Sequence, residues 1–238
     1  MTNKDQEDHY KSTLNLVNIF VKSNQRKRIN LLSDIESDVE NIFLIGKKIF
    51  DDFDQKGDDW AAGWLLQVLK KHKPIFFNDK KYNNWFFTSS DENINYEELQ
   101  LRLLEQNFED ADRLTSSYLR KLAGKLAENR GYVFYSEVNN MSGTDLQTID
   151  RLWTIYSNGR FGFSIQAKLL KSVGKKYELL WPKIGWKKDG YWTRYPSSFS
   201  WSLEAPEGHM PLINQLRGVR LMDSILRHPA ISLRHNNI

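Results

Sequence analysis

The stretch Asp145-Leu-Gln-Thr-Ile-Asp-Arg-Leu-Trp153 has the spacing of a helix that packs one face against a protein core. Its apolar side chains recur three or four residues apart, the period of an α-helix, at Leu146, Ile149, Leu152 and Trp153. Asp145 is a good N-cap residue, because a carboxylate accepts hydrogen bonds from the free N–H groups of a first helical turn. Gly159 can end the helix in a left-handed conformation. The stretch therefore predicts a buried helix.

Helical periodicity continues on the N-terminal side of this stretch. From Leu14 to His72 the apolar residues repeat at helical spacing, which predicts a small helical bundle. Residues 96–106 and 110–123 predict the two helices of an antiparallel hairpin, joined by a short turn around Asn107.

Two further helices are expected on the C-terminal side. One starts at Ser164 and runs to Val173. The last begins at Pro211, which suits a first helical position, and is stopped by Pro229, leaving a short polar tail. Together these patterns predict an all-α fold.

The chain divides in a polar segment that lacks helical period. Between residues 74 and 95 the sequence turns to Asn, Asp, Lys and Ser with a few aromatics, which is typical of a linker. We place a boundary near residue 90, with an N-terminal helical bundle and linker over 1–90 and a core domain over 91–238.

Residues 174–210 form a long irregular segment rich in aromatic rings, here called the aromatic loop. Connections of this length are uncommon in compact domains, and those that exist are often binding loops. Its rings could line a trough for a flat hydrophobic ligand, or they could simply pin the loop to the helices. Eight rings fall within 25 residues, at Tyr177, Trp181, Trp186, Tyr191, Trp192, Tyr195, Phe199 and Trp201.

Basic side chains accompany these rings. Lys183, Lys187, Lys188 and Arg194 are interleaved with them. The predicted helix that follows presents Asn214, Arg217, Gly218 and Leu221 on one face, with Arg220 beside it. Arginine pairs with carboxylates through two parallel hydrogen bonds, so this mixture favours an anionic aromatic ligand. The alternative is that these arginines are ordinary solvated surface residues.

Several classes of protein are disfavoured. The chain has no cysteine, and its five histidines do not have the spacing of a metal site, although His209 in the aromatic loop could touch a ligand. No nucleotide-binding or hydrolase motif is present. We therefore expect no enzymatic activity and no metal site.

Composition bears on location and on other partners. No stretch approaches the roughly 20 apolar residues needed to cross a bilayer, and the acidic residues near the start disfavour a targeting peptide. The rings and cations could also bind single-stranded nucleic acid. The modest net charge of +4 disfavours that alternative, as do the acids of the aromatic loop, Glu178, Asp189, Glu204 and Glu207.

The sequence resembles the genomes-uncoupled-four family over roughly residues 95–230. The likeness is carried by several motifs in the family's order: Asp145 to Trp153, Gly159-Arg-Phe-Gly-Phe-Ser164, Lys183-Ile-Gly-Trp186, Ser202-Leu-Glu-Ala-Pro-Glu-Gly-His-Met-Pro211 and Asn214-Gln-Leu-Arg-Gly-Val219. The resemblance implies a helical core whose long loops bind protoporphyrin or magnesium protoporphyrin. It implies a regulator that stimulates magnesium chelatase in chlorophyll biosynthesis, with the large porphyrin-binding subunit as partner.

The resemblance also implies ligand contacts, which coincide with the rings and cations described above. We expect these contacts at Phe161, Phe163, Trp192, Tyr195, Phe199, Trp201, Asn214, Arg217 and Arg220. The expected location is the plastid stroma, from a plastid-encoded gene, or a cyanobacterial cytoplasm, with peripheral membrane association as a further expectation. The rival hypotheses are a tetrapyrrole (bilin) modifying enzyme and a single-stranded nucleic-acid binder.

Overall fold

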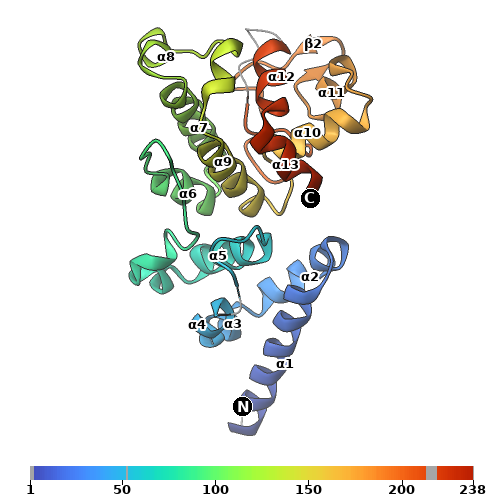
Figure 1. Ribbon diagram of the computed structural model, residues 1–238. Helices are drawn as coiled ribbons and strands as arrows, with labels where there is room; N and C mark the ends of the chain where they lie inside the picture. Colours follow the sequence, from blue (N-terminus) through green and yellow to red (C-terminus); the bar gives the residue numbers. More distant parts are fainter. Residues whose placement is uncertain (1–2, 52, 213–218, 238) are drawn as a thin grey trace.

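The computed structural model of the chain describes residues 3–51, 53–212 and 219–237, and it is mostly helical (Figure 1). The only regular strands among these residues form one short hairpin. The predicted all-α fold is thus confirmed. No helix within the described ranges is long and apolar enough to cross a lipid bilayer.

The N-terminal part consists of helices, as its periodicity predicts. They are α1 (Asn3–Lys22), α2 (Gln25–Ser37), α3 (Val39–Ile45), α4 (Lys47–Phe50) and α5 (Trp60–His72), followed by the short 3-10 helices η1 (Pro74–Asn78) and η2 (Lys80–Tyr82). Side-chain caps fix two of the helix starts, because Asn24 accepts from the Lys27 N–H and Asp59 accepts from the Ala61 N–H.

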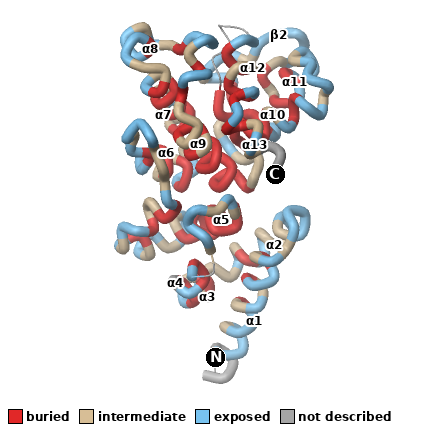
Figure 2. Tube along the Cα trace, viewed as in Figure 1, coloured by how far each residue is buried: buried red, intermediate tan, exposed pale blue. Residues whose placement is uncertain are grey.

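Helix α5 lies between the other N-terminal helices and the rest of the chain, and it is buried along most of its length (Figures 1 and 2). A Cβ atom on Gly63 would lie 2.7 Å from the Ile155 carbonyl oxygen, so only glycine permits this approach of the two backbones. The Gln67 amide donates to the carbonyls of Leu103 and Tyr156. Because α5 is held this closely, its apolar residues form one continuous core with those of the C-terminal half.

The predicted hairpin is confirmed as α6 (Glu97–Leu104) and α7 (Phe108–Leu122). Asn107 caps α7 by accepting from the Asp110 N–H. The helices and the 3-10 turn that follow are α8 (Lys125–Arg130), η3 (Tyr135–Asn140), α9 (Gly143–Ile155) and α10 (Phe163–Ser172).

Helix α9 is the buried helix predicted from Asp145 to Trp153, but its cap is different. The N-cap residue is Ser142, whose hydroxyl accepts from the Asp145 N–H. Asp145 is fully buried inside the first turn, where it accepts from the Tyr96 hydroxyl at 2.7 Å and from the Asp91 N–H at 2.9 Å. The prediction of Asp145 as the cap was wrong, because its carboxylate holds the preceding linker instead.

The aromatic loop contains more regular structure than its sequence suggests. Helix α11 (Tyr177–Lys183) forms despite Pro182 in its last turn, and β1 (Lys187–Lys188) pairs antiparallel with β2 (Tyr191–Trp192). Asp189 and Gly190 both have positive φ at the turn of this hairpin, as the Asp-Gly pair predicts.

Two helices end the described chain, α12 (Val219–Arg227) and α13 (Pro229–Asn237). Pro229 therefore begins a helix, and the prediction of a polar tail after it was wrong. Residues 211 and 212 are not helical, so the predicted helix start at Pro211 was wrong as well. Residues 213–218 lie outside the described ranges.

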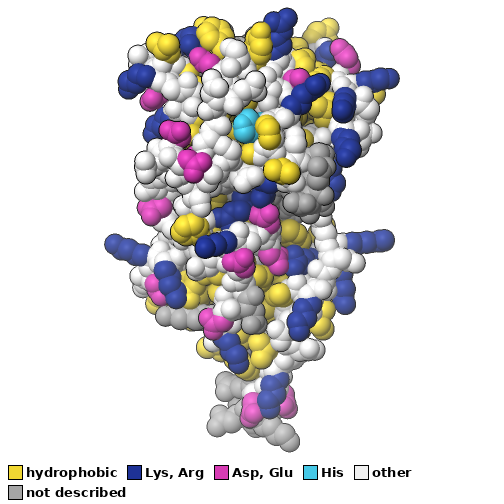
Figure 3. All heavy atoms as spheres, in the orientation of Figure 1, with side chains coloured by type: hydrophobic (Ala, Val, Ile, Leu, Met, Phe, Trp, Pro, Cys, Tyr) yellow, Lys and Arg dark blue, Asp and Glu magenta, His cyan; other side chains and the backbone are white. Residues whose placement is uncertain are grey.

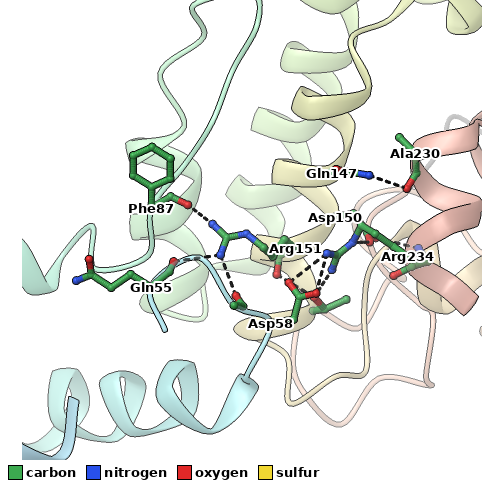
Figure 4. Close-up of polar contacts among 11 residues, drawn as sticks. Gln55, Asp58, Phe87, Gln147, Asp150, Arg151, Ala230 and Arg234 are labelled. Carbon is green, nitrogen blue, oxygen red and sulfur yellow. Dashed lines mark hydrogen bonds and ion pairs between the residues drawn. The ribbon is translucent and has the colours of Figure 1, made fainter. Parts of the chain in front are cut away.

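Two arginines, the buried Arg151 and the largely buried Arg234, join the N-terminal part to the C-terminal half (Figure 4). Arg151 donates to the carbonyls of Gln55, Gly57 and Phe87. Arg234 of α13 pairs with Asp150 at 2.6 Å and with Asp58 at 2.9 Å. We call this network the junction. The boundary near residue 90 stays a prediction, although apolar contacts and the junction both cross it.

Candidate ligand-binding face

The aromatic loop is organised around a stack of buried indole rings. Trp181 and Trp186 lie parallel, with ring centroids 5.6 Å apart and an interplanar angle of 8°. The Trp186 indole N–H donates to the His209 carbonyl at 2.8 Å, so this buried polar group is satisfied. These two rings hold the loop in place, which is the structural role considered above as the alternative to ligand binding.

Trp192 lies on the outside of this stack. Its ring centroid is 5.5 Å from that of Trp181, yet 47% of the residue remains exposed. Lys187 places its ammonium 5.6 Å from the ring centroid. Neighbouring Tyr191 is 80% exposed. The β1–β2 hairpin thus presents aromatic surface and positive charge to solvent.

A second cluster is formed by Tyr195, Phe199 and Trp201, whose ring centroids lie 5.8–6.1 Å apart. Tyr195 is 46% exposed and Trp201 is partly buried. Phe199 is buried against the His209 imidazole, with ring centroids 5.0 Å apart. The exposed Tyr195 ring is therefore supported from below by a packed one.

Arg113 of α7 joins this cluster from outside the aromatic loop. Its interaction with Tyr195, followed by the charge of Glu109, raises the pKa of Arg113, and its guanidinium also pairs with the Glu109 carboxylate at 2.6 Å. The sequence gives no signal for this contact, because Arg113 is one of several charged residues on an amphipathic helix. A carboxylate next to Tyr195 would meet this guanidinium.

The opposite flank is built from η3 and α12. Arg220 places its guanidinium carbon 5.5 Å from the centroid of the Tyr135 ring, and both residues are exposed. Phe134 and Val219 are exposed beside them in sequence. The aromatic run 132–135 in an irregular stretch is a signal that sequence reasoning could have used for this flank.

The exposed aromatic residues and arginines of these elements are here called the ligand face. In Figure 1, β2, α12 and α8 lie along the same end of the molecule, and Figure 3 shows hydrophobic and basic side chains mixed along that end. A region where exposed apolar groups gather is often an interaction site. The face is formed by Tyr135, Tyr191, Trp192, Tyr195, Trp201 and Arg220, with Arg113 at its edge.

Five of the predicted contacts do not belong to this face as described, and one of them is Phe199, which is buried beneath Tyr195. Phe161 and Phe163 are fully buried, and Phe161 packs edge-on against Phe108 with centroids 5.7 Å apart. In this structure both rings are core residues, and their expected role as direct ligand contacts stays a prediction. Asn214 and Arg217 lie outside the described residues.

No cluster of three or more His, Asp or Glu side chains suited to hold a metal ion occurs in the described part of the chain. The fold and the face define a mostly helical protein with an aromatic and basic surface at one end.

Comparison with known proteins identifies the family. A profile of GUN4-like proteins matches residues 89–229, more than half of the chain. The chain therefore belongs to the GUN4-like family, which confirms the resemblance found in its sequence.

Individual relatives agree with this assignment. A Ycf53-like protein of Synechocystis sp. (strain ATCC 27184 / PCC 6803 / Kazusa) is 48% identical over 72% of this chain and 76% of its own length. The chloroplastic tetrapyrrole-binding protein of Arabidopsis thaliana is 40% identical over 60% of this chain and 57% of its own length.

Two solved structures are also similar. GUN4 from Chlamydomonas reinhardtii has a TM-score of 0.59 at 35% identity and covers 63% of this chain and 96% of its own. The ligand-free GUN4 of Arabidopsis thaliana has a TM-score of 0.54 at 41% identity, covering 60% of this chain and 99% of its own.

Proposed function

We propose that this protein binds a tetrapyrrole, protoporphyrin or magnesium protoporphyrin, on the ligand face. The observation that carries the proposal is the pair of half-exposed rings Trp192 and Tyr195, which lie beside basic side chains on a packed aromatic support. The Arabidopsis relative named as a tetrapyrrole-binding protein supports the choice of ligand.

The chemistry of the face suits such a ligand. A porphyrin macrocycle is flat and apolar, so it gains from lying against rigid aromatic faces. Its propionates are carboxylates, which arginine binds well. Arg113 and Arg220 are the described candidates for this role, and Arg217 is the candidate that the sequence adds.

Binding and release are sufficient for this function, so we infer a carrier or regulator without a catalytic step. At about 0.3 kcal/mol per heavy atom, a ligand of about 40 such atoms reaches at most about 12 kcal/mol, a nanomolar ceiling. Ordering of loops lowers this value. We therefore expect a dissociation constant between sub-micromolar and micromolar, which allows the ligand to be passed on.

We further propose that the protein stimulates magnesium chelatase through its large porphyrin-binding subunit. The expected setting is a plastid stroma or a cyanobacterial cytoplasm, with peripheral contact to membranes. Chloroplastic and cyanobacterial relatives support this setting. The test is a chelatase assay with and without the protein: an unchanged rate of magnesium insertion would contradict stimulation while leaving binding untouched.

The binding proposal is tested by titrating deuteroporphyrin with the protein and following the shift of the Soret absorption band. Trp192→Ala and Arg217→Ala should each weaken binding by at least several-fold, whereas Trp192→Phe should keep most of the affinity because it keeps an aromatic face. Saturable binding unaffected by either alanine variant would place the site elsewhere, and no saturable binding would refute the tetrapyrrole proposal.

A further inference from the structure

A buried acid lies beneath the ligand face. Asp112 of α7 is about 1% exposed, and its Oδ1 accepts a hydrogen bond from the Leu212 N–H at 2.6 Å. The two residues are 100 positions apart in sequence. This bond therefore holds the backbone that follows the aromatic loop against α7. The next residue of α7 is Arg113, whose interaction with Tyr195 raises the pKa of Arg113.

Neighbouring groups act on the ionisation of Asp112 in both directions. Burial raises the pKa of Asp112 to about 7, the Leu212 N–H and Arg113 lower it, and Glu109 raises it. The pKa of Tyr195 is raised as well, by burial first and then by the negative charge of Asp112. Asp112 is thus close enough to Tyr195 for its charge to act on the face.

We propose that Asp112 is a positioning residue of the ligand face and that an anionic ligand binds tightly only when this carboxyl is neutral. The inference rests on the proposed function. A ligand lying on Tyr195 removes water from this region and brings carboxylates with it. Both effects disfavour an ionised acid below, so binding should be coupled to uptake of a proton by Asp112.

The direction of the pH dependence follows from this coupling. The free protein has Asp112 mostly protonated at pH 6 and mostly ionised at pH 8, whereas the complex requires the protonated form. Affinity should therefore fall as pH rises from 6 to 8, by up to about tenfold, because one pH unit above the pKa changes the protonated fraction about tenfold. Burial also lowers the pKa of His209, whose imidazole packs against Phe199 in the second aromatic cluster.

The stability of the folded protein should depend on pH in the same direction as the affinity for ligand. Because the folded pKa of Asp112 is raised above its ordinary value, the folded state binds the extra proton. The unfolding free energy should decrease as pH rises from about 4 to about 7 and then level off.

The decisive variant is Asp112→Asn, whose amide oxygen can still accept from the Leu212 N–H but which cannot ionise. It should bind deuteroporphyrin within about twofold of the wild type at pH 6 and keep that affinity at pH 8. Asp112→Ala leaves the Leu212 N–H without its partner and should bind about fivefold or more weakly at both pH values. Thermal melts followed by circular dichroism show whether each variant is folded.

Calorimetry in two buffers of different ionisation enthalpy gives a second measurement. At pH 7 the wild type should take up about half a proton on binding, as expected for a group with a pKa near 7, and Asp112→Asn should take up none from this site. An Asp112→Asn variant with the wild-type pH dependence would overturn the inference. So would a wild type that binds equally well at pH 6 and 8, which would leave the proposed function standing. A wild type that does not bind at either pH would refute the proposed function itself.

Discussion

Residues 145–164 and the aromatic loop both combine rings with charged side chains, but the structure treats them in opposite ways. In the first segment Phe161, Phe163 and Arg151 are buried, and the guanidinium is satisfied by three backbone carbonyls. In the loop, Trp192 and Tyr195 are half exposed on a support of buried rings.

The difference shows that a strong sequence motif can reflect packing inside the protein and not contact with a ligand. A segment whose rings are packed in the core and whose buried guanidinium is paired leaves little freedom to its residues, so a motif forms there without any ligand. A binding surface needs only some of its rings on the outside. Burial therefore separates the two roles, and residue type does not.

The largest effect that would test this contrast is expected at Phe161. Phe161→Ala removes a fully buried ring and should lower the free energy of unfolding by about 3–5 kcal/mol, measured by chemical denaturation. The matched control is Tyr191→Ala, a ring that is 80% exposed, which should leave the denaturation midpoint unchanged. If both variants lost the same stability, the assignment of Phe161 to the interior would be wrong.

The next effect is expected at the junction. Asp150 is fully buried, pairs with Arg234 and also accepts from the Ser164 N–H at 2.8 Å. Asp150→Ala should lower the unfolding free energy by about 3 kcal/mol, because it leaves a buried charge with one partner fewer. Glu204→Ala on the exposed part of the aromatic loop is the control. A loss below about 1 kcal/mol would indicate that Asp58 alone satisfies Arg234.

The smallest effect is expected at the exposed arginine of the ligand face. Arg220→Ala should weaken porphyrin binding about fivefold, a loss of roughly 1 kcal/mol, since exposed ion pairs are worth no more than this. Its stability should not change. Arg102→Ala on α6 removes a partly exposed charge, paired with Glu98 and Glu105, away from the face and should bind as the wild type does. Equal losses in both variants would point to general charge attraction instead of a contact.

Much of the fold follows from periodicity. Helices α5, α7 and α9 have apolar stripes long enough to fix their position, and side chains of the expected cap types, Asp59 and Asn107, start two of them. Proline was the main source of error, because Pro182 lies within the last turn of α11 and Pro229 begins α13. A proline disrupts a helix when it lies in the helix interior, but it is compatible with the first turn of a helix. Its effect therefore depends on its position, which the sequence alone does not give.

The site could be predicted in part. The exposed rings Trp192 and Tyr195 follow from the irregular, aromatic composition of the loop. Arg113 and Asp112 do not, because they lie 80 or more positions from the loop residues they contact and only tertiary packing brings them there. Phe161 and Phe163 were placed on the face by the motif around them, which carries no information about burial.

The pairing of Asp58 with Arg234 has a consequence for the order in which the chain folds during synthesis. These residues are 176 positions apart, so during synthesis the loop before α5 emerges long before its partner does. The N-terminal helices can form early from local contacts, whereas the junction closes only after α13 has been made. Formation of α13 is thus the step that joins the loop before α5 to the C-terminal half of the core.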